Sequence, residues 1–262
     1  MTLPSLFIAH GAPDLPFSRT PARAFTESLG QGILGIRAIL IISAHWEARV
    51  PTLGTAPAPD TIHDFGGFDD RLYSMTYPAR TAGPVIDEVA QALTAAGVPH
   101  ATDPQRGYDH GVWIPLMLAF PAADVPVIQL SLRRGATAAE NLALGQALAP
   151  LRDRGILIIG SGATVHNLRF LAREGSPVPA WAQAFDDWIV TLVEKGDIDS
   201  LVRFPADPPG ARQAHPTPEH LMPLFVALGA GGGRGRALHR SFSWGSVGMT
   251  AFAFGDRTGA AG

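Results

Sequence analysis

The sequence of 262 residues contains no cysteine. Disulfide bonds, thiolate metal sites and cysteine nucleophiles are therefore excluded. Lysine is almost absent as well, because Lys195 is the only one, and the formal net charge is −3. Since no basic stripe runs along the chain, nucleic acid is not expected as a partner.

Long hydrophobic runs are also missing, although 46% of the residues are hydrophobic. The most apolar run, Gly32–Ala44, is interrupted by Arg37 and is too short to cross a bilayer. The N-terminus lacks the basic segment, apolar core and cleavage site of a signal peptide. We therefore expect a cytoplasmic protein with no membrane partner.

Three apolar runs are the strongest strand signals in the sequence. They are rich in isoleucine and leucine, which is typical of strands buried on both faces of a parallel sheet. The runs are SLFIAH, which ends on His10, AILIISAH, which ends on His45, and the strand and Gly-rich turn of ILIIGSGATVHN, which place His166 just beyond the strand end. No polar linker divides the chain, and its length suits one core. We predict a single α/β domain over residues 1–262, with a central, mostly parallel sheet flanked by helices.

The helices are predicted from apolar spacing and from end signals. The expected ranges are Thr20–Leu29, Thr81–Ala96, a helix beginning near His110, Ala138–Leu151 and Ala180–Glu194. A last helix is expected in HPTPEHLMPLFVALGA, with Thr217 as its N-cap, Pro218 at its first position and His220 in its first turn. The stretch Arg49–Pro78, which contains HDFGGFDD, is expected to form a long ordered loop over the site.

The positions of four histidines predict a metal site. Ligands of parallel sheets bind outside the carboxyl ends of the strands, which is where His10, His45 and His166 are expected. At a helix N-terminus the dipole would keep His220 neutral, as a metal ligand must be. Nitrogen ligands without cysteine suit zinc or non-haem iron(II), and spacing does not separate the two. Ser161 is not expected to be a nucleophile, because the G-x-S-x-G pattern is absent.

Six motifs between residues 5 and 254 together resemble those of the class III extradiol ring-cleavage dioxygenases, in the branch that contains the DOPA 4,5-dioxygenases. The motifs are IAHGAPD around His10, IISAHWE around His45, GGFDDRLYSMTYPA, YDHGVWIPL around His110, GSGATVHNL around His166 and HPTPEHLMPLFVALGA around His220. The resemblance implies an enzyme that cleaves the ring of a small aromatic diol, a catechol, with O2.

The resemblance also implies roles for these residues and one Fe(II) or Zn(II) per chain. Carried over by motif, His10, His45 and His220 would be the metal ligands. His166 would be the acid/base residue, close enough to become a fourth ligand in a resting zinc form. His110 would hydrogen-bond the substrate or oxygen. Distant relatives have a glutamate as the third ligand, whereas the matching position here is His220, next to Glu219.

Two alternatives remain at this stage. Three histidines and an open position also make catalytic zinc sites, so the chain could be a zinc hydrolase of the same superfamily or a non-catalytic metal-binding protein. Arginines in loops, such as Arg106, are candidates for binding a substrate carboxylate.

Overall fold

The centre of the molecule is a mixed β-sheet. The computed structural model describes residues 2–206, 208 and 210–255, and among these residues six strands form the sheet. In spatial order they are β6 (Val127–Gln129), β2 (Ala38–Ser43), β8 (Ile156–Gly162), β1 (Ser5–Ala9), β12 (Ala251–Phe254) and β9 (Gly235–His239). β6, β2, β8 and β1 are parallel, while β12 and β9 are antiparallel to their neighbours. The predicted α/β fold with a mostly parallel sheet is confirmed; positions 1, 207, 209 and 256–262 of the predicted domain lie outside the described residues.

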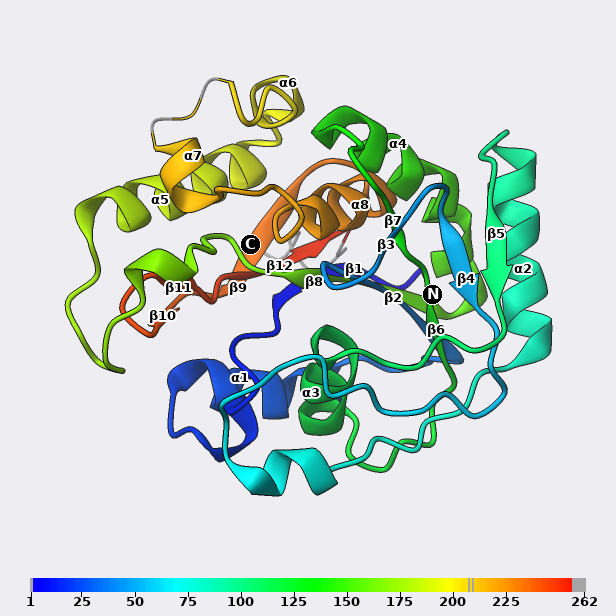
Figure 1. Cartoon of the computed structure of the whole chain (residues 1–262). Coiled ribbons are helices and arrows are strands. Elements are labelled where there is room, and N and C mark those ends of the chain that lie inside the picture. Colours follow the sequence, from blue (N-terminus) through cyan, green and yellow to red (C-terminus); the bar gives the residue numbers. More distant parts are fainter. Residues whose placement is uncertain (1, 207, 209, 256–262) are drawn as a thin grey trace.

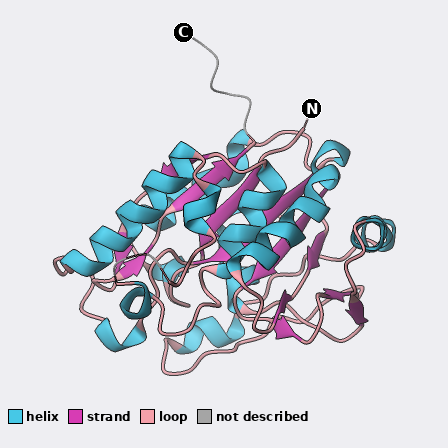
Figure 2. Cartoon of the chain, turned by 90° about the horizontal axis from the view of Figure 1, so that it is seen from above, coloured by secondary structure: helices cyan, strands magenta, loops and turns pink. Residues whose placement is uncertain are grey.

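Helices cover both faces of this sheet (Figures 1 and 2). Within the described residues they are α1 (Pro21–Leu29), α2 (Gly83–Ala95), α3 (His110–Ala119), α4 (Ala138–Leu148), α5 (Ala180–Lys195), α6 (Ile198–Leu201), α7 (Ala211–Ala214) and α8 (Met222–Gly231). α2, α4, α5 and α8 share one buried apolar cluster with the sheet, and α1 and α3 share the other. Alternate residues of β2 enter the two clusters, Leu40 and Ile42 on one side and Ile39 and Ile41 on the other.

Side-chain caps stabilise the starts of two helices. The Thr20 side chain accepts a hydrogen bond from the backbone N–H of Arg23 at the start of α1. α4 begins with a capping box between Thr137 and Glu140. α4 ends at Leu148 rather than at the predicted Leu151, because the next residues, which include Pro150, form a 3₁₀ turn.

The predicted start of the last helix is wrong. α8 begins at Met222, four residues later than expected, and His220 lies in the turn before it. The reason is tertiary, because this turn packs directly on the end of β8. The carbonyl oxygen of His220 accepts a hydrogen bond from Ala163 N–H at 2.9 Å. A Cβ on Gly162 would lie only 2.0 Å from that oxygen, so the small residues of the GSG sequence permit the close approach.

The long loop predicted near the site contains more regular structure than expected. The loop expected over Arg49–Pro78 includes β4 (Thr52–Gly54), which pairs with β5 (Ala101–Asp103), and a 3₁₀ turn. The remaining short strands are β3 (Glu47–Ala48), paired with β7 (Leu132–Arg133), and β10 (Phe242–Ser243), paired with β11 (Val247–Gly248). These pairs connect the loops on which the site residues lie.

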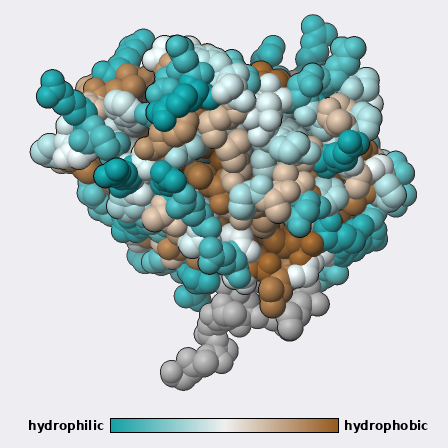
Figure 3. Space-filling model, turned by 90° about the horizontal axis from the view of Figure 1, so that it is seen from below, coloured by the Kyte–Doolittle hydropathy of each residue, from teal (hydrophilic) through white to brown (hydrophobic). Residues whose placement is uncertain are grey.

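The surface carries polar and apolar side chains interspersed. Figure 3 shows the face seen from below, where hydrophilic residues predominate and hydrophobic ones form small patches. Among the described residues, every helix is too short or too polar to cross a membrane.

Candidate metal and substrate site

Three adjacent parallel strands deliver three histidines to one edge of the sheet. β8 lies between β1 and β2, and register pairs Ala9 with Gly162 and Ser43 with Ser161. His10 follows β1 directly, His45 comes two residues after β2, and His166 comes four residues after β8. The predicted crevice at the carboxyl ends of the strands is therefore present.

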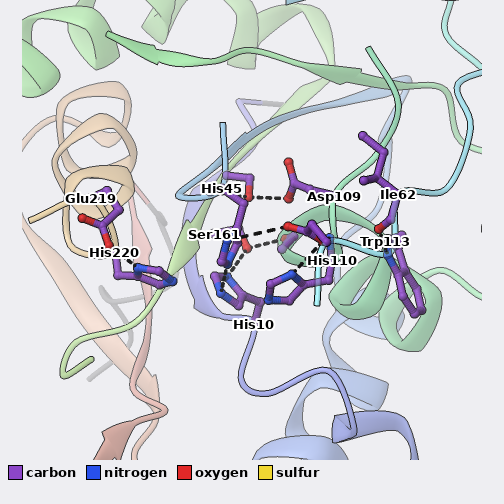
Figure 4. Close-up of polar contacts among 12 residues, drawn as sticks. His10, His45, Ile62, Asp109, His110, Trp113, Ser161, Glu219 and His220 are labelled. Carbon is purple, nitrogen blue, oxygen red and sulfur yellow. Dashed lines mark hydrogen bonds and ion pairs between the residues drawn. The ribbon is translucent and has the colours of Figure 1, made fainter. Parts of the chain in front are cut away.

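The five histidines predicted for the site share one cavity. His10, His45, His110, His166 and His220 all line a cavity of about 710 Å³. The ring centroids of His10 and His45 lie 4.8 Å apart, those of His45 and His220 also 4.8 Å, and those of His10 and His220 5.4 Å. Figure 4 shows His10, His45 and His110 grouped together, with His220 approaching from the other side.

Ser161 fixes which nitrogen of His10 faces the cavity. Its hydroxyl donates to the carbonyl oxygen of Gly111, so its oxygen accepts at 3.0 Å from Nδ1–H of His10. With the proton on Nδ1, the lone pair of His10 is on Nε2. Ser161 is fully buried, so it orients a histidine instead of acting as a nucleophile.

Replacing Ser161 with alanine is expected to weaken metal binding by about 10- to 100-fold, because nothing then holds the tautomer and ring plane of His10. Competition with a chelator of known affinity measures the change. Ser5→Ala is the matched control, since Ser5 is also fully buried and donates to a backbone carbonyl, that of Ala227, but does not line the cavity. Equal losses in both variants would exclude the orienting role of Ser161.

The nitrogens of His10 and His45 converge as two ligands of one ion would. Their Nε2 atoms lie 3.0 Å apart, and Nδ1 of His45 lies 3.8 Å from an Asp64 oxygen. Two nitrogens at 2.0–2.1 Å from one tetrahedral ion are separated by roughly 3.3 Å, which is close to this distance. The pair therefore fits a metal.

His220 supplies a third nitrogen of the same kind. Its Nδ1–H donates to the carboxylate of Glu219 at 2.9 Å, which places the lone pair on Nε2. This Nε2 atom is buried and has no hydrogen-bond partner among the described residues. A buried nitrogen left unpaired is costly, and a metal ion would satisfy it. Glu219 thus supports the ring of His220 in the manner of a carboxylate behind a metal-bound histidine.

His110 also lies within reach of the first two histidines. One nitrogen each from His10, His45 and His110 fall within 4.8 Å of one another, as do ligand atoms of His166, Glu219 and His220. His110 is, however, anchored on its other side, because its backbone N–H and its Nδ1–H both donate to Asp64, at 3.0 and 2.9 Å. Burial acts to raise the pKa of Asp64, but the hydrogen bonds from His110 outweigh it and hold that pKa at about 2.

Four histidines of the site are held in their neutral form. Burial lowers the pKa of His10, His45, His166 and His220, and neighbouring histidines lower it further, in the case of His45 to about 4. At neutral pH these imidazoles carry lone pairs and no charge, as metal binding and proton acceptance both require.

His166 is placed beside the proposed ligands. Its ring stacks on that of His220, with centroids 3.5 Å apart and planes 8° from parallel. Its backbone N–H donates to the carbonyl oxygen of Ala214, which fixes the loop after β8. His166 thus faces the cavity from a fixed backbone.

Sequence reasoning missed the carboxylates behind the site. Asp64 lies in the HDFGGFDD motif and Asp109 directly precedes His110, so both were visible but without an assigned role. Asp109 is fully buried and accepts hydrogen bonds from Ser43 at 2.6 Å and from Arg106 at 2.7 Å. The suggestion that Arg106 binds substrate is wrong, because Arg106 pairs with Asp109, lies over the ring of Trp46 and does not line the cavity.

Comparison with known proteins identifies the family. The family described as the catalytic LigB subunit of aromatic ring-opening dioxygenase matches residues 18–255. The chain belongs to this family. It shares 39% identity over 256 residues with 4,5-DOPA dioxygenase extradiol of Beta vulgaris, covering 95% of this chain and 96% of that protein. The protein of the same name from Escherichia coli K12 is 37% identical over 238 residues, which are 88% of this chain and 86% of that one.

A solved structure agrees in fold. The crystal structure of the uncharacterized protein JW3007 from Escherichia coli K12 matches with a TM-score of 0.79 and 31% identity, over 96% of this chain and 99% of that chain. The family and its named relatives confirm the predicted enzyme class, an extradiol ring-cleavage dioxygenase. LigB dioxygenases depend on a metal, and the clustered histidines could hold one.

Proposed function

We propose that this LigB-family chain cleaves the ring of a catechol-type substrate with O2, using one metal ion held by His10, His45 and His220. The observation that carries the proposal is the convergence of the His10 and His45 Nε2 atoms beside the buried, unpaired Nε2 of His220. Relatives named for DOPA, itself a catechol, support the substrate class.

Fe(II) is the metal proposed for turnover, and Zn(II) would fit the same three nitrogens. Three protein ligands leave open positions, and Fe(II) there would supply Lewis acidity toward the catechol oxygens and redox chemistry for O2. Family membership supports this activity over a zinc hydrolase or a non-catalytic metal-binding protein. A cytoplasmic location and the absence of a nucleic-acid partner stay predictions.

The remaining tasks belong to side chains of the cavity. His166, neutral because of its burial, would accept a proton from a catechol hydroxyl and return it to the opening ring. His110, oriented through Nδ1 by Asp64, would hydrogen-bond the substrate or oxygen with its other nitrogen. Apolar side chains such as Phe65, Phe68 and Trp244 also line the cavity and would pack on the aromatic ring and exclude water.

Reconstitution of the metal-free chain under anaerobic conditions tests the proposal. We expect oxygen uptake with catechols, and a yellow ring-fission product, after loading with Fe(II) but not after loading with Zn(II). If the Fe(II)-loaded chain, with its metal content confirmed, takes up no oxygen with any of a varied panel of catechols, the proposed function is contradicted.

A further inference from the structure

The cavity contains one charged side chain that the chemistry above does not use. Among the described residues that line it, Arg169 carries the one guanidinium, and no lysine is present. The two carboxylates of the lining are engaged, Asp64 with His110 and Glu219 with His220. The Arg169 guanidinium, by contrast, has no ion-pair or hydrogen-bond partner in the described part of the chain.

The backbone of Arg169 is held close to the acid/base histidine. Arg169 is the middle residue of the 3₁₀ turn Leu168–Phe170, three positions after His166. Its N–H donates at 3.0 Å to Oδ1 of Asn167, whose Nδ2 in turn donates at 2.6 Å to the carbonyl oxygen of Gln213. Asn167 is itself buried. The guanidinium therefore extends from a fixed point on the cavity wall.

Two leucines flank the exposed Arg169 in the sequence and present apolar surface at the cavity. Leu168 and Leu171 also line the cavity, yet 63% and 46% of their surface is exposed. Apolar side chains around an ion pair displace water when a ligand enters, which strengthens the attraction between the charges. A planar guanidinium binds a carboxylate through two parallel hydrogen bonds.

The size of the cavity leaves room for more than a catechol ring. Its volume of about 710 Å³ falls within the range of pockets for drug-sized ligands, roughly 300–1,000 Å³. A ring whose hydroxyls face His10 and His45 would direct a substituent toward another part of the lining.

We propose that Arg169 binds a carboxylate on the side chain of the catechol, so that the enzyme prefers catechols carrying an anionic substituent. This inference rests on the proposed function, because the catechol ring must occupy the histidine end of the cavity. Arg169 is thus a specificity-determining residue, and it takes the role first suggested for Arg106.

The test compares a matched pair of ligands, 3-(3,4-dihydroxyphenyl)propionate and its neutral methyl ester. With Fe(II)-loaded protein, Arg169→Met should lower kcat/KM for the acid by about tenfold, mainly through a higher KM, as expected for loss of one charge-assisted pair. The ester should change by less than about twofold. Arg169→Lys should fall between, because lysine keeps the charge but not the bidentate geometry. Arg173→Met is the control, since Arg173 is exposed nearby but does not line the cavity.

Ligand binding to the Zn(II)-loaded protein, measured by calorimetry, separates this inference from the proposed function. A preference for the acid over the ester that disappears in Arg169→Met supports the inference even if no ring cleavage occurs. If Arg169→Met loses equal affinity for the acid and the ester, or if neither affinity changes, the inference is overturned.

Discussion

His166→Ala is expected to lower kcat by about 10²- to 10⁴-fold while the chain keeps one metal ion. This is the usual contribution of a positioned acid/base group to the rate. Burial lowers the pKa of His166, so the ring is neutral and can accept a proton at neutral pH. Its stacking against His220 places it beside the proposed metal ligands without using the His220 nitrogens. Oxygen uptake and metal content, measured on the same sample, check both halves of the prediction.

One control variant and two alternative outcomes make the result specific. His100→Gln should leave turnover unchanged, because His100 does not line the cavity and its ring nitrogen bonds the carbonyl oxygen of Val98. Full activity of His166→Ala with metal retained would refute the acid/base role. Loss of metal along with activity would make His166 a ligand instead.

His220→Ala and His110→Ala are expected to separate metal binding from catalysis. His220→Ala should weaken metal binding by more than about 100-fold, because removing even a residue behind a ligand costs 10- to 100-fold. It removes the buried Nε2 that has no partner in the described residues. His110→Ala should keep the metal and lower kcat/KM by about 100-fold, because His110 is anchored to Asp64 and contributes a hydrogen bond rather than a ligand.

Metal per chain after gel filtration, determined by atomic emission, distinguishes the two ligand sets. One nitrogen of His110 lies close enough to those of His10 and His45 to be a ligand. Either His110 or His220 could therefore be the third ligand, and the two variants distinguish them. If His110→Ala loses the metal and His220→Ala retains it, the ligands are His10, His45 and His110. The proposed role of His220 would then be wrong.

Local signals explain why most elements could be predicted. Thr20 before Pro21 and the Thr137–Glu140 pair cap their helices with neighbouring groups, so those helix starts are determined by adjacent residues. The same type of signal failed at Thr217. There the carbonyl oxygen of His220 accepts a hydrogen bond from Ala163 N–H, and the Thr217 hydroxyl donates to Glu219 instead of capping a helix.

The hydrogen-bond partners of the site histidines also divide into sequence neighbours and residues far away in the sequence. Glu219 is adjacent to His220 in the sequence, so its closeness was visible, although not its hydrogen bond to Nδ1. Asp64 lies 46 residues from His110, and Ser161 lies 151 residues from His10. Contacts over such separations depend on the order of strands and on loop packing, which no local pattern encodes.

The sequence by itself determined the fold class and the absence of thiol chemistry, and it singled out the five histidines that line the cavity. Strands buried on both faces need continuous apolar runs, so His10 and His45 could be placed at strand ends from residue type alone. Only the tertiary structure decided which nitrogens face the cavity, because strand order brings β1, β8 and β2 side by side. It also decided between two arginines. Arg106 forms an ion pair with the buried Asp109, whereas Arg169, in the turn after His166, lies on the cavity wall.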